Sequence, residues 1–173
     1  HHIICDGSSS SIFMEELSKL YNKDMLEENY FDYKDYALWE ENYFKSDLFK
    51  KDEAYWLSKF PKKEQPVLGM PTSFTRPSTV SFEGNKLSYE LTDNKKLQEV
   101  CSKLNTTPYL FMLSVYYLLL YKYTNQEEIV VGTPVIGRNI KETNRMIGMF
   151  VNTLALKNKI DIEQTFFDFV QTI

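Results

Sequence analysis

Apolar side chains recur every three to four residues in several segments of the chain, and this spacing predicts a helix in each of them. A cluster of serines after residue 7 is expected to cap the first helix, and Asn22 marks its end. Thr107-Pro108 is expected to open the most apolar helix, because proline suits the first helical position. The predicted helices run from the serine cluster to Asn22, over 33–44, over 50–60, from the Thr92-Asp93 cap to Leu104, over 108–121 and over 161–173.

Short runs of β-branched and aromatic residues predict strands between these helices. The first run, 3–5, leads into a tight corner at Asp6-Gly7, where Gly7 is free to adopt a positive φ. Gly84-Asn85 favours a hairpin turn between two further runs. The predicted strands are 3–5, 80–82, 87–91, 129–135 and 150–156. Helices and strands together predict an α/β fold, a two-layer sandwich of helices on a mixed β-sheet.

Composition narrows the classes of protein that this chain can represent. A chain of 173 residues, 43% of them hydrophobic, is long enough for one sizeable core. Its net charge of -4 provides no basic surface of the kind that nucleic acids bind. The longest apolar run, 109–121, is interrupted by Ser114 and is shorter than the roughly 20 residues that a membrane span needs. Cys5 and Cys101 are expected to be buried free thiols, which suits the reducing cytoplasm.

The two histidines of the chain are adjacent, at the start of the sequence His-His-Ile-Ile-Cys-Asp-Gly. Imidazole titrates near neutral pH, so this pair is a candidate for proton handling. On an extended segment, neighbouring side chains point to opposite faces, and His1 and His2 would not converge on one ion. The pattern therefore predicts one catalytic and one structural histidine and no metal site.

Residues 1–7 resemble the His-His-x-x-x-Asp-Gly motif of the condensation domains of non-ribosomal peptide synthetases, a branch of the chloramphenicol-acetyltransferase-like acyltransferases. Three later segments are similar to further motifs of this family and follow in the same order: Tyr-Lys-Asp-Tyr-Ala-Leu-Trp at 33–39, Val-Gly-Thr-Pro-Val-Ile-Gly-Arg at 131–138 and Ile-Gly-Met-Phe-Val-Asn-Thr-Leu-Ala at 147–155. The resemblance implies a chloramphenicol-acetyltransferase-like lobe. Residues 1–10 would be the active-site motif and corner from the end of an N-terminal lobe, and 11–173 the C-terminal lobe. We therefore expect a fragment that is inactive by itself.

The function implied by the resemblance is amide bond formation. An aminoacyl or peptidyl thioester on the 4'-phosphopantetheine arm of an upstream peptidyl carrier protein would be attacked by the amine of a downstream aminoacyl group. No cofactor would be bound directly. The expected partners are the two carrier domains, the N-terminal lobe of the same domain and an adenylation domain. Two alternatives are a non-catalytic module of the same fold that docks carrier proteins or tailoring enzymes, and a coenzyme A-dependent acyltransferase.

The catalytic residues expected from the first motif are His1, His2, Asp6 and Gly7. His2 would either manage a proton or orient the attacking amine. Asp6 would hold the loop by pairing with an arginine, which we expect outside this chain. Gly7 would offer its amide to the oxyanion or only permit the turn, and the turn is favoured two to one. Tyr33 and Asp35 would anchor the second helix to the active-site loop.

Four further residues are expected to bind substrate: Ser9, Trp39, Arg138 and Asn152. Ser9 would hydrogen-bond near the tetrahedral centre, although an N-cap is the stronger expectation for it. Trp39 is equally consistent with a core residue and a tunnel wall. Arg138 would meet a phosphate or cap a surface turn. Asn152 would be costly to bury without a partner, so its amide is expected to order a loop or line the tunnel for the carrier arm.

Overall fold

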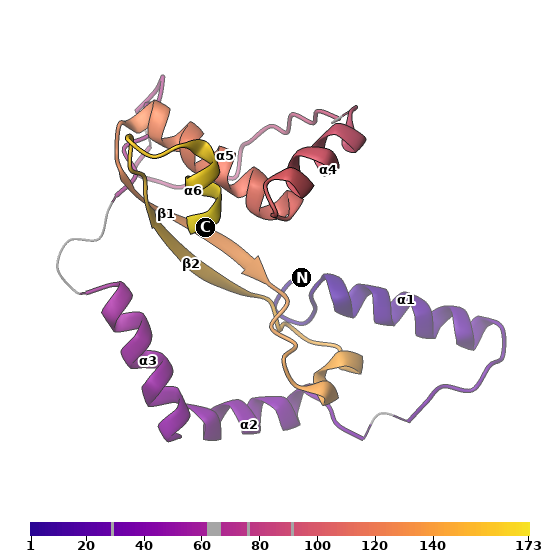
Figure 1. Cartoon of the computed structure of the whole chain (residues 1–173). Helices are drawn as coiled ribbons and strands as arrows, with labels where there is room; N and C mark the ends of the chain where they lie inside the picture. Colours follow the sequence, from indigo (N-terminus) through magenta and orange to yellow (C-terminus); the bar gives the residue numbers. More distant parts are fainter. Residues whose placement is uncertain (29, 62–66, 76, 91) are drawn as a thin grey trace. The chain divides into compact units, whose positions relative to one another are not determined.

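The computed structural model describes residues 1–28, 30–61, 67–75, 77–90 and 92–173 (Figure 1). The chain divides into two compact units, one of His1–Gln65 and Val131–Leu156 and the other of Pro66–Val130 and Lys157–Ile173. The motif at the N-terminus and the Gly-Arg and Phe-Val-Asn motifs therefore lie in the same unit, which we call the first unit.

The α-helices of the first unit begin where a polar side chain caps the free amides of the first turn. Asp6 caps α1, and Asp32 caps α2 in a reciprocal capping box with Asp35. Ser46 caps α3, which therefore begins earlier than the predicted residue 50. The bounds are α1 Gly7–Tyr21, α2 Tyr33–Phe44, α3 Asp47–Lys59 and the short 3-10 helix η1 Lys141–Arg145. The predicted helix over 33–44 and the end of the first helix at Asn22 are confirmed.

The second unit contains α4 Asn94–Lys103, α5 Pro108–Thr124 and α6 Phe166–Thr172. Thr107 caps α5 and Pro108 is its first residue, as predicted. The predicted helix over 161–173 starts too early, because Thr165 caps α6 and residues before it form a turn. Tyr117 of α5 is fully buried and meets Phe169 of α6 edge-on, with ring centroids 6.4 Å apart. No helix among the described residues is long and apolar enough to cross a membrane.

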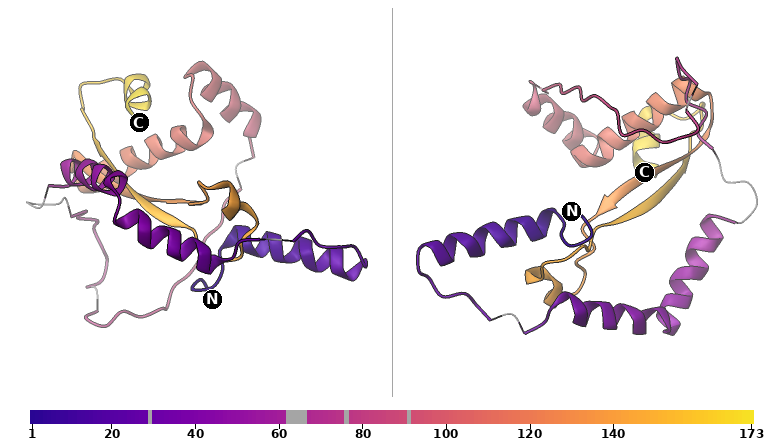
Figure 2. Two further views of the ribbon diagram at one scale, coloured as in Figure 1. Left: turned by 90° about the horizontal axis from the view of Figure 1, so that it is seen from below. Right: turned by 180° about the vertical axis from the view of Figure 1, so that it is seen from behind.

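Two strands, β1 Glu128–Val135 and β2 Asn152–Lys159, pair with each other (Figures 1 and 2). The pairing is antiparallel, because Ile160 donates to the carbonyl of Glu127 at one end while Gly137 lies against Phe150 at the other. The strands predicted at 129–135 and 150–156 are thus confirmed with shifted ends. Helices combined with strands confirm the predicted α/β class, and the described residues contribute these two strands to the sheet.

The prediction of strands was wrong in two regions of the chain. Residues 2–4 form a turn, because Ile4 donates to the carbonyl of His1 and Ile3 to the imidazole Nδ1 of the same residue. The backbone groups that a strand would offer to a partner are therefore used locally. The hairpin around Gly84-Asn85 is also absent from described residues 77–90, which are exposed and carry no strand; Leu91 lies outside the described residues. An isolated hairpin that buries no apolar face is marginal in water.

Candidate active site

The carboxylate of Asp6 is the centre of a buried polar network in the first unit. Asp6 is 1% exposed and has the extended backbone of an N-cap. Its Oδ1 accepts from the amide of Ser9 at 2.7 Å, and its Oδ2 accepts from the amide of Phe150 at 3.2 Å. The first motif of the chain is therefore bonded directly to the Phe-Val-Asn motif, 144 residues later.

Arg138 supplies the counter-charge for this carboxylate. Its Nη2 lies 3.0 Å from Asp6 Oδ1, and the side chains of Arg138 and Asp6 are 5% and 0% exposed. The expectation that the arginine lies outside this chain was therefore wrong. Local patterns do not connect the two residues, because they are 132 positions apart.

The other hydrogen bonds of Arg138 go to backbone around η1. Its Nη1 donates to the carbonyls of Thr143 and Met146, and its guanidinium carbon lies 4.1 Å from the ring centroid of Phe150. Of the two roles predicted for Arg138, the geometry matches the turn cap. Contact with a phosphate is not tested and stays an expectation.

The pKa of Asp6 follows from these contacts. Burial would raise it, because a low dielectric disfavours the charged form. The hydrogen bonds from the amide and hydroxyl of Ser9, from Arg138 and from the amide of Phe150 outweigh burial and lower the pKa of Asp6 to about 2. The carboxylate is therefore charged at neutral pH, and it acts as an acceptor rather than an acid.

Ser9 links the same network to Gly148. Ser9 is 1% exposed, and its Oγ accepts from the amide of Gly148 at 3.0 Å and from Arg138 Nη2 at 3.0 Å. The single hydroxyl proton has two acceptors within 2.8 Å, Asp6 Oδ1 and the carbonyl of Gly148. The predicted N-cap role was wrong for Ser9, because Asp6 is the cap and Ser9 donates its amide to it. Burial of Ser9 among these groups favours a structural role.

Both histidines are exposed at the edge of this network. The Nδ1 of His2 lies 3.2 Å from the carbonyl oxygen of Cys5. If Nδ1 carries the proton, this bond fixes the ring and leaves Nε2 as an acceptor, which is the tautomer needed to receive a proton or orient an amine. Because residues 2–4 form a turn, the argument that two strand neighbours must face opposite sides does not apply to His1 and His2. Among the described residues, no group of three or more His, Cys, Asp or Glu side chains is placed to hold a metal ion.

Gly7 begins α1 and does not adopt the positive φ that the sequence suggested for it. A Cβ added to Gly7 would meet no atom of the described chain within 4 Å, so nothing in this unit requires a glycine there. The glycine with a positive φ is instead Gly137, at 71°, where a Cβ would lie 1.9 Å from the carbonyl oxygen of Phe150. The sequence placed Gly137 only within the motif over 131–138 and did not predict this close approach.

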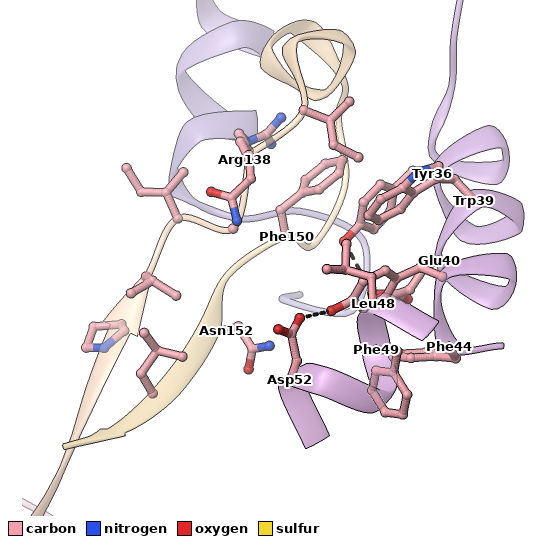
Figure 3. Close-up of a pocket in the computed structure, with 18 of the residues that line it drawn as sticks. Tyr36, Trp39, Glu40, Phe44, Leu48, Phe49, Asp52, Arg138, Phe150 and Asn152 are labelled. Carbon is pink, nitrogen blue, oxygen red and sulfur yellow. Dashed lines mark hydrogen bonds between the residues drawn. The ribbon is translucent and has the colours of Figure 1, made fainter. Parts of the chain in front are cut away.

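An open groove of about 1690 Å³ lies beside the network in the first unit (Figure 3). Rings from α2 and α3 form one wall, and the segment after β1 with the start of β2 forms the other. Trp39 is stacked between Tyr36 and Tyr43, at 5.7 and 5.5 Å between centroids. We call this cavity the aromatic groove. Among its lining residues are Tyr36, Trp39, Glu40, Tyr43, Phe49, Asp52, Trp56, Arg138, Phe150 and Asn152.

Three of the four residues predicted to bind substrate, Trp39, Arg138 and Asn152, line the aromatic groove. Asn152 is exposed, and its side-chain oxygen accepts from the next amide along the strand at 2.8 Å. Ser9 and His2 are not among the lining residues, so the structure does not bring all predicted site residues into one cavity. Three of the predicted substrate-binding residues therefore share the groove, while Asp6, Ser9 and Arg138 share the buried network.

Comparison with known proteins identifies the family. The condensation-domain family model matches residues 1–173. Gramicidin S synthase 2 of Brevibacillus brevis is 45% identical over 177 residues, which cover 100% of this chain and 4% of that protein. Surfactin synthase subunit 1 of Bacillus subtilis (strain 168) is 41% identical over 175 residues, which cover 100% of this chain and 5% of that protein. The chain belongs to the condensation-domain family, and it spans only a small part of the curated relatives that it matches.

Solved structures agree on the fold. The first condensation domain of the calcium-dependent antibiotic synthetase matches with a TM-score of 0.74 and 24% identity, over 99% of this chain and 39% of that one. The X-domain from teicoplanin biosynthesis matches with a TM-score of 0.87 and 18% identity, over 99% of this chain and 41% of that one. These matches confirm the predicted α/β fold of the chloramphenicol-acetyltransferase type.

Proposed function

We propose that this chain forms part of a condensation domain that joins an aminoacyl or peptidyl thioester to the amine of a second aminoacyl group. The observation that carries the proposal is the buried pair of Asp6 and Arg138. This pair, with the amide of Phe150, bonds the histidine loop to the Phe-Val-Asn motif. Burying an ion pair is costly in itself, so the pair supports a loop whose exact position matters.

The proposed reaction requires little chemical activation by the protein. A thioester is already activated, so the protein's work is to position two reactants and to handle one proton. In the proposed reaction the amine attacks the thioester carbonyl, the C–S bond breaks and the thiol of the upstream arm leaves. His2 would accept the proton of the amine or orient its lone pair, through an Nε2 that the bond of Nδ1 to Cys5 leaves free. Gly7 would offer its amide near the oxyanion.

The partners follow from the same proposal. Two peptidyl carrier domains would bring their 4'-phosphopantetheine arms as substrates, and an adenylation domain would load them. The remainder of the condensation domain would complete the site around residues 1–10, while 11–173 supply the C-terminal lobe. Trp39, Arg138 and Asn152 would contact substrate from the aromatic groove. The free thiols of Cys5 and Cys101 favour the reducing cytoplasm as the compartment.

The test is amide formation by the complete domain supplied with two loaded carrier proteins, with mass spectrometry of the product. His2→Ala should reduce the yield by at least about 100-fold, the lower end of what general acid–base catalysis contributes. Because His2 is exposed, the variant should fold normally. Met25→Ala is the matched control, since Met25 is 92% exposed and should have no effect.

Undiminished amide formation by His2→Ala rejects the catalytic role of His2. Carrier binding without amide formation by the unmodified domain would instead identify a docking module. The 173 residues alone should form no amide, and measurable product from them would overturn the proposal that other parts of the domain complete the site.

A further inference from the structure

Tyr33 is the first residue of α2, and its side chain lies against the segment that receives Asp6. Its hydroxyl donates to the carbonyl of Met149 at 2.8 Å. Its ring meets that of Phe150 edge-on, at 5.2 Å between centroids. Burial raises the pKa of Tyr33, with smaller contributions from the charges of Glu40 and Asp6, so the hydroxyl remains a donor.

The ring of Tyr33 packs directly against the backbone of Gly148. A Cβ added to Gly148 would lie 2.0 Å from Cδ2 of Tyr33 and 2.5 Å from Cε2. Gly148 is buried and has no positive φ, so the backbone conformation does not require a glycine there. The requirement comes from the ring of Tyr33, which occupies the place of a side chain.

The segment that Tyr33 holds also binds the catalytic loop. The amide of Gly148 donates to Ser9 Oγ and the amide of Phe150 donates to Asp6 Oδ2. Met149, between these two donors, is the residue whose carbonyl Tyr33 binds. Three consecutive residues thus connect α2 to the loop on which His2 stands.

We propose that Tyr33 is a positioning residue for condensation, which acts on His2 through Gly148–Phe150 and Asp6. This inference rests on the proposed function of the domain. Tyr33 touches no reacting atom in the proposal. Its hydrogen bond and its ring fix the register of the two amides that hold the histidine loop, so its loss should loosen the placement of His2 without removing any substrate contact.

The first test is Tyr33→Phe in the complete domain, assayed for amide formation with two loaded carrier proteins. Removing one hydrogen bond of this kind should lower kcat about three- to tenfold. The KM for each loaded carrier should stay within about twofold, because substrate contacts are unchanged. Tyr21→Phe is the matched control, since it removes the hydroxyl of a tyrosine that is 87% exposed.

The second test is a double-mutant cycle between Tyr33→Ala and Gly148→Ala. If Gly148 must be glycine because of the ring, Gly148→Ala should be severe in the unmodified chain and nearly neutral in the Tyr33→Ala background. Gly84→Ala is the control for adding a methyl group, because a Cβ there meets nothing within 4 Å. If Gly148→Ala fails to fold alone, recovery of folded protein in the double variant gives the same answer.

The outcomes separate this inference from the proposed function. Wild-type kcat in Tyr33→Phe, or effects of Tyr33→Ala and Gly148→Ala that multiply independently, overturns the positioning role. The Tyr33→Phe variant could also lose kcat only because it is partly unfolded. In that case its midpoint of thermal unfolding is lower and its kcat recovers at lower temperature, and this result also overturns the positioning role. If His2→Ala abolishes amide formation while Tyr33→Phe is unaffected, only the positioning role fails. If His2→Ala is fully active, the catalytic role of His2 fails, and if the unmodified domain forms no amide, the proposed function itself fails.

Discussion

Removing the guanidinium of Arg138 should destabilise the condensation domain strongly, because it leaves the carboxylate of Asp6 buried without its counter-charge. The two side chains are 5% and 0% exposed, so water does not replace the lost partner. Breaking a buried pair from one side costs about 3–5 kcal/mol. Arg138→Met keeps most of the volume of the side chain and removes the charge and the bonds to Thr143 and Met146, so we expect a loss in this range.

The pH dependence gives an independent magnitude. The pKa of Asp6 is about 2 in the folded chain, against an ordinary value of 3.8. This difference corresponds to about 2 kcal/mol of stability at neutral pH. Because the folded pKa is the lower one, this contribution is fully present above pH 3.8 and is lost as the pH falls toward 2. In Arg138→Met the pKa of Asp6 should rise, so the deficit of the variant should shrink on acidification.

The assay is urea unfolding of the complete domain at pH 7 and at about pH 3, between the two pKa values of Asp6, for Arg138→Met, Asp6→Asn and the double variant. The two effects should be less than additive at pH 7, with a coupling of at least about 2 kcal/mol. Arg145→Met is the control, because Arg145 pairs with Glu15 and Glu16 at a site where its side chain is 39% exposed. Its loss should cost no more than about 1 kcal/mol. Equal losses in Arg138→Met and Arg145→Met, or strict additivity, would refute the reasoning.

Two further predictions concern backbone strain and thiol access. Gly137→Ala should cost at least about 2 kcal/mol, because the residue has a φ of 71° and its Cβ would overlap the carbonyl of Phe150; thermal unfolding beside Gly84→Ala, expected to be nearly neutral, checks this. In the native domain an uncharged thiol reagent should modify Cys5, which is partly exposed, faster than Cys101, which is 2% exposed. Peptide mapping after timed alkylation checks this, and equal rates for the two cysteines would contradict it.

Local sequence predicted the elements whose signals lie within one or two turns. The start of α5 followed from Thr107-Pro108, and the bounds of α2 followed from the helical spacing of its apolar side chains. The start of α1 was misplaced because serine and aspartate are comparable N-caps. The competition was decided by contacts that no local pattern contains, since Asp6 is also the partner of Arg138 and of the Phe150 amide.

Contacts between distant segments also decided which of the predicted strands formed. The runs that became β1 and β2 each had the other as a partner, and they formed. The run at 3–5 and the one at 80–82 had no partner among the described residues, and neither formed a strand. Propensity for extended structure therefore did not suffice without a neighbouring strand. Gly148 was missed for a related reason, since the ring that excludes a side chain there comes from Tyr33.

The central claim is that the buried network around Asp6 holds His2 in place for amide formation. The most direct measurement is the single-turnover rate of amide formation by the complete domain with both carriers loaded, for Asp6→Asn, His2→Ala and the double variant. The account predicts that the rate of Asp6→Asn is at least about tenfold below that of the unmodified domain. It also predicts that the double variant is no slower than His2→Ala alone, because Asp6 acts only through the placement of His2. A wild-type rate for Asp6→Asn, or a double variant slowed by the product of the two effects, would contradict it.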